Sequence, residues 1–161
     1  MKLSNFWRRP APWLALLALV APLAAVQPAA AQHEHEAGAH TLKLDNGRNW
    51  STDAPLRQGM SVIRNAVAAD HQSIHSDNET AAQYNALATK IDGQIAYIVK
   101  NCKLAPKADA QLHVVLAEIA AGSDLMKGAD KAKRNEGVAK IVRALGTYPQ
   151  YFDHPGWRAL E

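Results

Sequence analysis

The sequence contains little cysteine and few aromatic residues. Cys102 is the one cysteine among 161 residues, and aromatic residues account for 6% of the chain. A single cysteine excludes an internal disulfide, a multi-cysteine zinc or iron–sulfur site and the C-x-x-C-H attachment of a c-type haem. The fold must therefore be stabilised by packing. Because Cys102 falls on an apolar stripe, we expect a buried and inert thiol.

An excess of charge of one sign is also absent once residues 1–31 are set aside. This segment has a basic start, an apolar run too short to span a bilayer and the small residues Ala29, Ala30 and Ala31, which predicts a signal peptide cleaved after Ala31. The chain has 18 Lys and Arg against 15 Asp and Glu, and this segment holds three basic and no acidic residues, so 15 of each remain. Balanced charge argues against nucleic-acid binding. We expect a periplasmic protein without membrane contact after processing.

Four stretches of the remaining chain carry apolar residues at helical spacing. The stripes are Leu56, Met60, Ile63, Val67 and Ile74; Tyr84, Leu87, Ile91, Ile95 and Ile98; Leu112, Val115, Ile119 and Met126; and Val138, Ile141, Leu145, Tyr148 and Phe152. Each stretch has one apolar face, and short polar turns join the stretches. This pattern predicts an all-α fold, an antiparallel up-down-up-down four-helix bundle over residues 54–154.

Capping residues and prolines set the expected helix ends. Thr52 or Asp53 can cap the first helix, Asp77 or Asn78 can cap the second, and Pro106 closes the second. Outside the bundle, we expect a flexible tail and N-terminal segment over residues 32–53 and a C-terminal tail over residues 155–161. The one extended piece expected is at residues 41–44.

Two histidines near the end of the first helix form a candidate metal site. His71 and His75 are four residues apart, so their rings can share one metal ion on a helix face. Two ligands are too few, and further donors would come from Asp77, Glu79, Asp130 or the N-terminal tail. In the alternative reading, His71 is a hydrogen-bonded boundary residue and His75 is a cation favoured by the helix dipole.

The tail contains its own candidate ligands. His33 and His35 flank Glu34, and His40 follows shortly after. These nitrogen and oxygen donors suit copper, nickel or zinc, but nothing in the sequence enforces a geometry. A soluble spacer without metal is the alternative.

Three segments of the bundle carry a resemblance to a known family. They are "GMSVIRNAV", "TAAQYNALATKI" and "LHVVLAEIAAGSDLM", and over residues 55–154 the chain resembles soluble periplasmic bundles of the cytochrome b562 type. The resemblance implies electron transfer by a b-type haem held by Met60 and His154. Nine residues separate Leu145 from His154, which places His154 about 180° from the apolar stripe unless Pro149 kinks or ends the helix.

A second resemblance begins just before the first helix. The stretch "WSTDAPLRQGMSVIR", after a leader that contains histidines, is similar to small exported proteins of the DnrO type, found beside denitrification functions. This resemblance implies a bacterial periplasmic protein linked to nitrogen-oxide metabolism.

Enzyme motifs are absent from the sequence. We find no nucleophile elbow, glycine-rich phosphate loop, H-E-x-x-H motif or carboxylate cluster on one face, so we do not expect an enzyme. Three functional classes remain, in this order: a bundle that binds or carries a metal ion, a haem-binding electron carrier, and a bundle that acts only by binding a protein partner.

Overall fold

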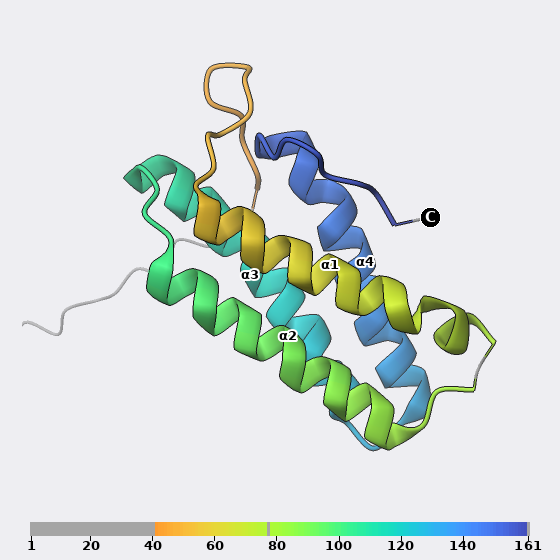
Figure 1. Cartoon of the computed structure of the whole chain (residues 1–161). Helices are drawn as coiled ribbons and strands as arrows, with labels where there is room; N and C mark the ends of the chain where they lie inside the picture. The colour runs from red at the N-terminus through yellow and green to blue at the C-terminus, as the bar shows by residue number, and fades with distance from the viewer. Residues whose placement is uncertain (1–40, 77, 161) are drawn as a thin grey trace, which may run out of the picture. The chain divides into compact units, whose positions relative to one another are not determined.

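Four helices form the regular structure of the computed structural model, which describes residues 41–76 and 78–160 (Figure 1). The helices are α1 (Ala54–His75), α2 (Ala81–Asn101), α3 (Pro106–Met126) and α4 (Lys131–Tyr151). Each helix packs against the next, and α1 also packs against α4. No strand occurs within these residues, so the predicted all-α four-helix bundle is confirmed. The predicted signal peptide and the tail histidines lie outside the described residues.

Local hydrogen bonds explain where α1 and α2 begin. Asp53 caps α1 as predicted, and its side chain accepts a hydrogen bond from the Leu56 N–H at 2.9 Å. The predicted cap of α2 at Asp77 or Asn78 is wrong, because Thr80 caps this helix. Thr80 and Gln83 form a capping box: the Gln83 N–H donates to Thr80 Oγ, and the Thr80 N–H donates to Gln83 Oε1 at 3.0 Å. This reciprocal pair satisfies two otherwise free donors.

Two prolines lie at helix ends, but not as the sequence predicted. Pro106 is the first residue of α3, whereas the sequence predicted that it closes α2. Proline is favourable at the first position of a helix, because the N–H that it lacks would have no partner there. Pro149 lies within the last turn of α4, and the helix continues to Tyr151 before it ends. The Pro149 carbonyl accepts a hydrogen bond from the Asn49 side-chain amide at 3.0 Å.

The predicted apolar stripes form the core. Every member of the third and fourth stripes is buried, and in the first two only Ile74 and Ile95 are partly exposed. Tyr84, Tyr148 and Phe152 are the largest fully buried side chains. The predicted helical period therefore identified the inner face of all four helices.

Helices α3 and α4 come into close contact at two glycines. A Cβ atom added to Gly122 would lie 2.6 Å from the Gly137 carbonyl oxygen, and one added to Gly137 would lie 2.5 Å from the Gly122 carbonyl oxygen. The two backbones are thus in direct contact. A residue with a side chain does not fit at either position unless the helices move apart.

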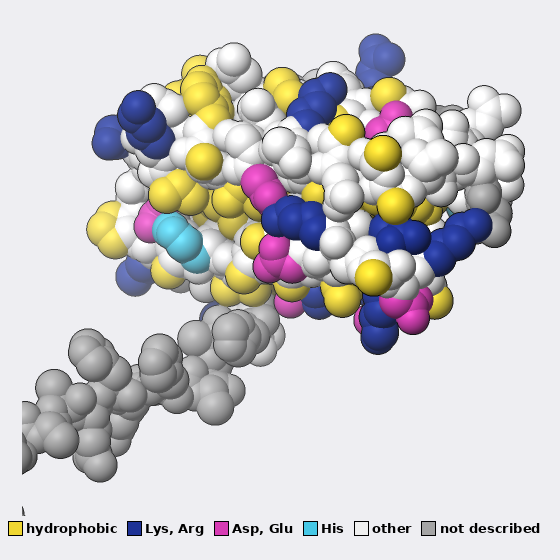
Figure 2. Space-filling view, turned by 90° about the horizontal axis from the view of Figure 1, so that it is seen from below, with side chains coloured by type: hydrophobic (Ala, Val, Ile, Leu, Met, Phe, Trp, Pro, Cys, Tyr) yellow, Lys and Arg dark blue, Asp and Glu magenta, His cyan; other side chains and the backbone are white. Residues whose placement is uncertain are grey.

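Charged side chains of both signs are mixed on the surface. Figure 2 shows lysine and arginine among acidic side chains on the face seen from below. This mixture agrees with the balanced charge of residues 32–161. None of the helices that the structure describes is both long and apolar enough to pass through a membrane.

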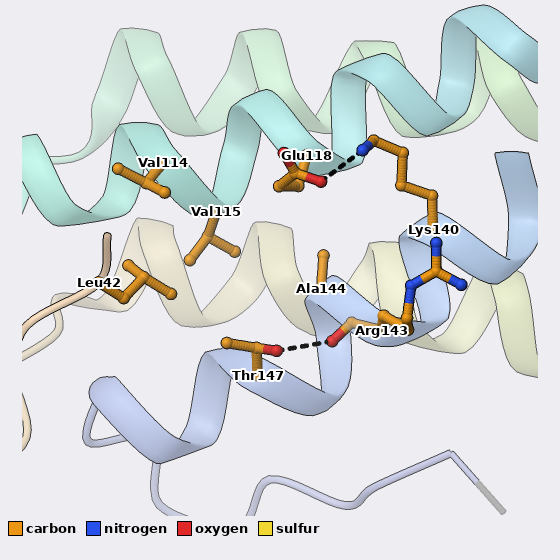
Figure 3. A pocket seen from close by; sticks show the side chains of 8 residues that line it. All are labelled: Leu42, Val114, Val115, Glu118, Lys140, Arg143, Ala144 and Thr147. Carbon is orange, nitrogen blue, oxygen red and sulfur yellow. Dashed lines mark hydrogen bonds and ion pairs between the residues drawn. The ribbon is translucent and has the colours of Figure 1, made fainter. Parts of the chain in front are cut away.

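The segment before α1 is tied to the opposite side of the bundle. Leu42 covers one end of a small groove between α3 and α4, where it lies with Val114 and Val115 (Figure 3). The Lys43 N–H donates to Gln111 Oε1 at 2.6 Å. Residues 41–53, the described part of the segment predicted to be flexible, therefore have fixed contacts with the helices.

Trp50 connects this segment to the end of α4. Its backbone N–H donates to the Tyr151 carbonyl at 2.7 Å, its carbonyl accepts from the Asp153 N–H at 2.9 Å, and its indole N–H donates to the Lys43 carbonyl at 2.7 Å. The predicted extended piece at residues 41–44 is not a strand. The backbone pairing between Trp50 and Phe152 is an isolated bridge.

Candidate metal site

His71 and His75 lie side by side at the C-terminal end of α1. Their Nε2 atoms are 2.9 Å apart, and their ring centroids are 4.2 Å apart at an interplanar angle of 70°. His71 is half-buried and His75 is exposed. Residues four apart face each other on a helix, so α1 itself brings both nitrogens to one point.

The spacing of the two nitrogens is close to that of a shared metal ion. Two nitrogens bound to zinc at 2.0–2.1 Å with a tetrahedral angle lie about 3.3 Å apart. At 2.9 Å one Nε2 atom carries a proton and donates it to the other. A metal ion would replace this proton, and the rings would separate by only a few tenths of an ångström.

The described residues do not complete the coordination sphere. No group of three His, Cys, Asp or Glu side chains within residues 41–76 and 78–160 is arranged to hold a metal ion. Glu79 faces Asp70, in a groove to which neither histidine contributes. Asp130 caps α4 by accepting a hydrogen bond from the Lys133 N–H at 3.1 Å. Asp77 and the tail histidines lie outside the described residues.

A hollow on the surface is lined by His71 but not by His75. It has a volume of about 570 Å³ and is also lined by Arg64, Arg158 and Leu160. The Arg64 guanidinium donates to the carbonyls of Arg158 and Ala159 at 3.0 and 2.9 Å, which fixes the C-terminal segment on α1. Two cationic side chains here oppose a bare cation and favour a metal ion that also carries an anionic ligand.

The second candidate pair, Met60 and His154, is arranged differently from the expectation. The chain leaves α4 after Tyr151 and turns back, so the helical phase does not apply to His154. Its Nε2 lies 3.3 Å from Ser61 Oγ, and its Nδ1 lies 3.1 Å from the Tyr148 hydroxyl. Met60, next to Ser61 in α1, is fully buried in the core. Both nitrogens of His154 have partners and Met60 has no open side, so this arrangement does not favour a haem between them.

The hydrogen bonds of His154 also determine what Ser61 can do. Burial raises the pKa of the Tyr148 hydroxyl, which therefore stays protonated. His154 Nδ1 is its one hydrogen-bond partner among the described residues, and we consider the tautomer in which the hydroxyl donates to Nδ1. The neutral ring then carries its proton on Nε2 and donates it to Ser61 Oγ. In this tautomer His154 cannot take a proton from Ser61, and the three side chains connect the C-terminal turn to α1 and α4.

His154 should make the fold less stable in mild acid. Burial, and then the nearby Arg57, lower the pKa of His154 below its ordinary value of 6.5, although Asp153 opposes this shift. The unfolded chain therefore binds the proton first, and the free energy of unfolding should fall as pH decreases from about 6.5 through the lower folded value. Urea denaturation at pH 7.5 and pH 5 measures this fall.

The matched control for this prediction is His154→Gln. This variant should lose about 1–2 kcal/mol at pH 7.5, because a partly buried ring with two hydrogen bonds is removed. The fall of wild type between pH 7.5 and pH 5 should exceed that of the variant. Equal falls in both proteins would show that another group is responsible.

Comparisons with known proteins do not add to this description. No protein-family model matches the chain, and searches of curated proteins and of solved structures gave no significant match. The resemblances to cytochrome b562-type bundles and to DnrO-type proteins thus receive no support from these comparisons and stay predictions.

Proposed function

We propose that this protein is a small periplasmic, non-enzymatic four-helix-bundle protein that binds or carries a transition-metal ion through His71 and His75. The 2.9 Å separation of the two Nε2 atoms is the observation that supports this proposal. Two protein ligands leave coordination positions for water or for a ligand from a partner, which suits exchange of the ion more than permanent retention. The expectation of export rests on the sequence of residues 1–31.

Imidazole ligands narrow the choice of metal. They suit copper, nickel and zinc, whereas magnesium and calcium prefer oxygen donors. His71 and His75 lie at the C-terminal end of α1, whereas the three tail histidines lie outside the described residues. We therefore treat His33, His35 and His40 as a separate and looser site. A link to nitrogen-oxide metabolism rests on the DnrO-type resemblance.

Calorimetric titration of the full chain with Cu(II) and with Zn(II) tests the bundle site. The variant in which His33, His35 and His40 are alanine should still bind one metal ion. At a free metal concentration 100 times Kd, binding should stabilise this variant by about 2.7 kcal/mol. Because metal competes with protons for imidazole nitrogen, affinity should fall as the pH is lowered.

The control replaces the other histidines. His71→Ala combined with His75→Ala, added to the tail variant, should abolish binding and the thermal stabilisation. His113→Ala, which changes an exposed histidine elsewhere, should leave both unchanged. If the tail variant binds no metal, the pair on α1 is a hydrogen-bonded helix end and the proposal is wrong.

A b-type haem is the second candidate, and it rests on the resemblance to cytochrome b562-type bundles. The turn after α4 brings His154 next to Ser61, which follows Met60 in α1. A continuous α4 helix would have placed His154 on the side away from the apolar stripe. Expression with added haem followed by an absorbance spectrum tests this. A haem spectrum that is lost in Met60→Leu would support this candidate. A protein free of haem and metal would favour the third class, a bundle that acts by binding a protein partner.

A further inference from the structure

A groove between α1 and α2 combines apolar walls with two carboxylates. Its volume is about 250 Å³, and Ala66, Ala69 and Ala86 line its apolar part. Asp70 on α1 and Glu79, just before α2, line it as well. Asp70 and His71 are neighbours in α1, but they open onto different hollows. The groove is therefore distinct from the proposed metal site.

Glu79 is the unusual residue of this groove. Only 6% of its surface is exposed, and its Oε2 atom is buried without a hydrogen-bond partner in the part of the chain that the structure describes. Burial raises the pKa of Glu79, and the charge of Asp70 raises it further. A buried carboxylate without a donor is unfavourable, and a second carboxylate beside it adds repulsion. A cation bound in the groove would offset the repulsion between the two carboxylates and favour the charged form of Glu79.

The groove itself does not supply that cation. Lys90 is its one basic lining residue, and it lies 11 residues beyond Glu79, which corresponds to about 16 Å along a helix. Lys90 is not among the groups that influence Glu79. The groove thus has an acidic end whose charge no described side chain balances.

We infer that this groove binds a small organic cation, with an ammonium group between Asp70 and Glu79 and a short carbon chain along the alanines. An ammonium group has three N–H donors and a positive charge, so it can lie between the two acidic residues that line the groove. Two carboxylates are few for a hard metal ion, which prefers six or more oxygen ligands. The apolar walls suit a carbon chain better than the water shell of a metal ion.

The n-butylammonium ion is a suitable probe, and the Glu79 carboxyl ¹³C resonance reports its binding in the full chain. A saturating amount of n-butylammonium chloride should move the titration midpoint of Glu79 to lower pH, because the cation stabilises the charged form. We expect a Kd on the order of 1 mM. The same concentration of n-butanol, and sodium chloride of equal ionic strength, should not move the midpoint.

Variants separate this site from a general salt effect. Asp70→Asn should weaken n-butylammonium binding by at least about tenfold, the effect of one lost charge-assisted hydrogen bond. Glu79→Gln should fold at least as stably as wild type, because it removes a buried charge without a partner, and should lose the thermal stabilisation by n-butylammonium. Glu118→Gln, which removes an exposed carboxylate between α3 and α4, should bind as wild type does.

Three results would overturn the inference. They are equal effects of n-butylammonium and sodium chloride, stabilisation that persists in Glu79→Gln, and a midpoint shift by Mg²⁺ or Ca²⁺ at concentrations where n-butylammonium has none. The His71→Ala and His75→Ala double variant should retain n-butylammonium binding. The groove and the proposed metal site can therefore fail independently.

Discussion

Gly122→Ala should lower the free energy of unfolding by about 3 kcal/mol, at the upper end of the usual effect of overpacking. The added Cβ would lie 2.6 Å from the Gly137 carbonyl oxygen and 2.6 Å from the Ile141 side chain. Ile141 can rotate, but a backbone carbonyl within a helix cannot, so α3 and α4 must separate. For a chain of this length the loss corresponds to a decrease in melting temperature of about 10 °C.

Gly146→Ala is the matched control for this substitution. Gly146 lies in α4 like Gly137, but nothing lies within 4 Å of its added Cβ. Alanine there should stabilise the protein by up to about 1 kcal/mol, because glycine is a poorer helix former. Urea denaturation followed by helical circular dichroism measures both variants. Equal stability of Gly122→Ala and wild type would mean that the two helices tolerate a wider separation.

The glycine contact illustrates what periodicity does not reveal. Burial of apolar side chains has the period of the helix, so the four stripes identified the core directly from the sequence. A glycine contributes no side chain to that pattern. Gly122 and Gly146 are therefore equivalent in the sequence, although the first is in backbone contact with α4 and the second is exposed.

The start of α2 could not be predicted from cap preference alone, because several neighbouring residues can cap a helix. Asp77, Asn78 and Thr80 are all good caps, and the choice rests on whether Gln83 can complete a capping box. The pattern of Thr80 and Gln83 three residues apart was visible in the sequence. The error at α2 was thus one of weighing local signals, whereas the burial of Glu79 depends on how α1 and α2 pack.

The sequence was sufficient to predict the part of the candidate site that lies within one helix. The spacing of His71 and His75 in α1 is enough to bring their nitrogens together. Other donors depend on the turns between helices, and the structure directs Glu79 and Asp130 elsewhere. His154 was misplaced for the same reason, because its position is set by a turn after α4 and not by the helical phase.

Asp53→Ala should be the second strongly destabilising change, because Asp53 joins two parts of the bundle. One carboxylate oxygen accepts from the Leu56 N–H at 2.9 Å and caps α1, and the other accepts from the Lys103 N–H at 2.6 Å after α2. Loss of the cap costs about 1 kcal/mol. Lys103 is exposed, so water can bond its N–H in the variant, and the lost hydrogen bond adds about 0.5–1.5 kcal/mol. We therefore expect a total loss of about 1.5–2.5 kcal/mol in urea denaturation at pH 7.

The reactivity of the Cys102 thiol gives a second test of the role of Asp53, independent of unfolding measurements. Its thiol donates to Asp53 Oδ1 at 3.4 Å, and burial together with this hydrogen bond and the charge of Asp53 raises the pKa of Cys102 to about 12. Cys102 is half-buried and not fully buried as the sequence predicted, and the raised pKa keeps its thiol protonated at neutral pH. In Asp53→Ala the thiolate fraction should rise, and iodoacetamide should react faster at pH 8.5 under native conditions. An unchanged rate would show that burial alone protects the thiol.

The dependence on acid follows from the charge of Asp53. Burial alone would raise the pKa of Asp53, but the hydrogen bonds from Lys103 and Leu56 outweigh it, so the folded pKa is below the ordinary value of 3.8. The stability contributed by its charge is then fully present above about pH 4 and is lost as pH falls through the lower folded value.

The variant Asp53→Asn tests this dependence, because it retains an oxygen for the α1 cap but has no charge to lose. The difference in unfolding free energy between wild type and Asp53→Asn should therefore be constant from pH 5 to 7 and shrink below pH 4. A difference that persists at pH 2.5 would mean that Asp53 acts through the shape of its side chain and not through its charge.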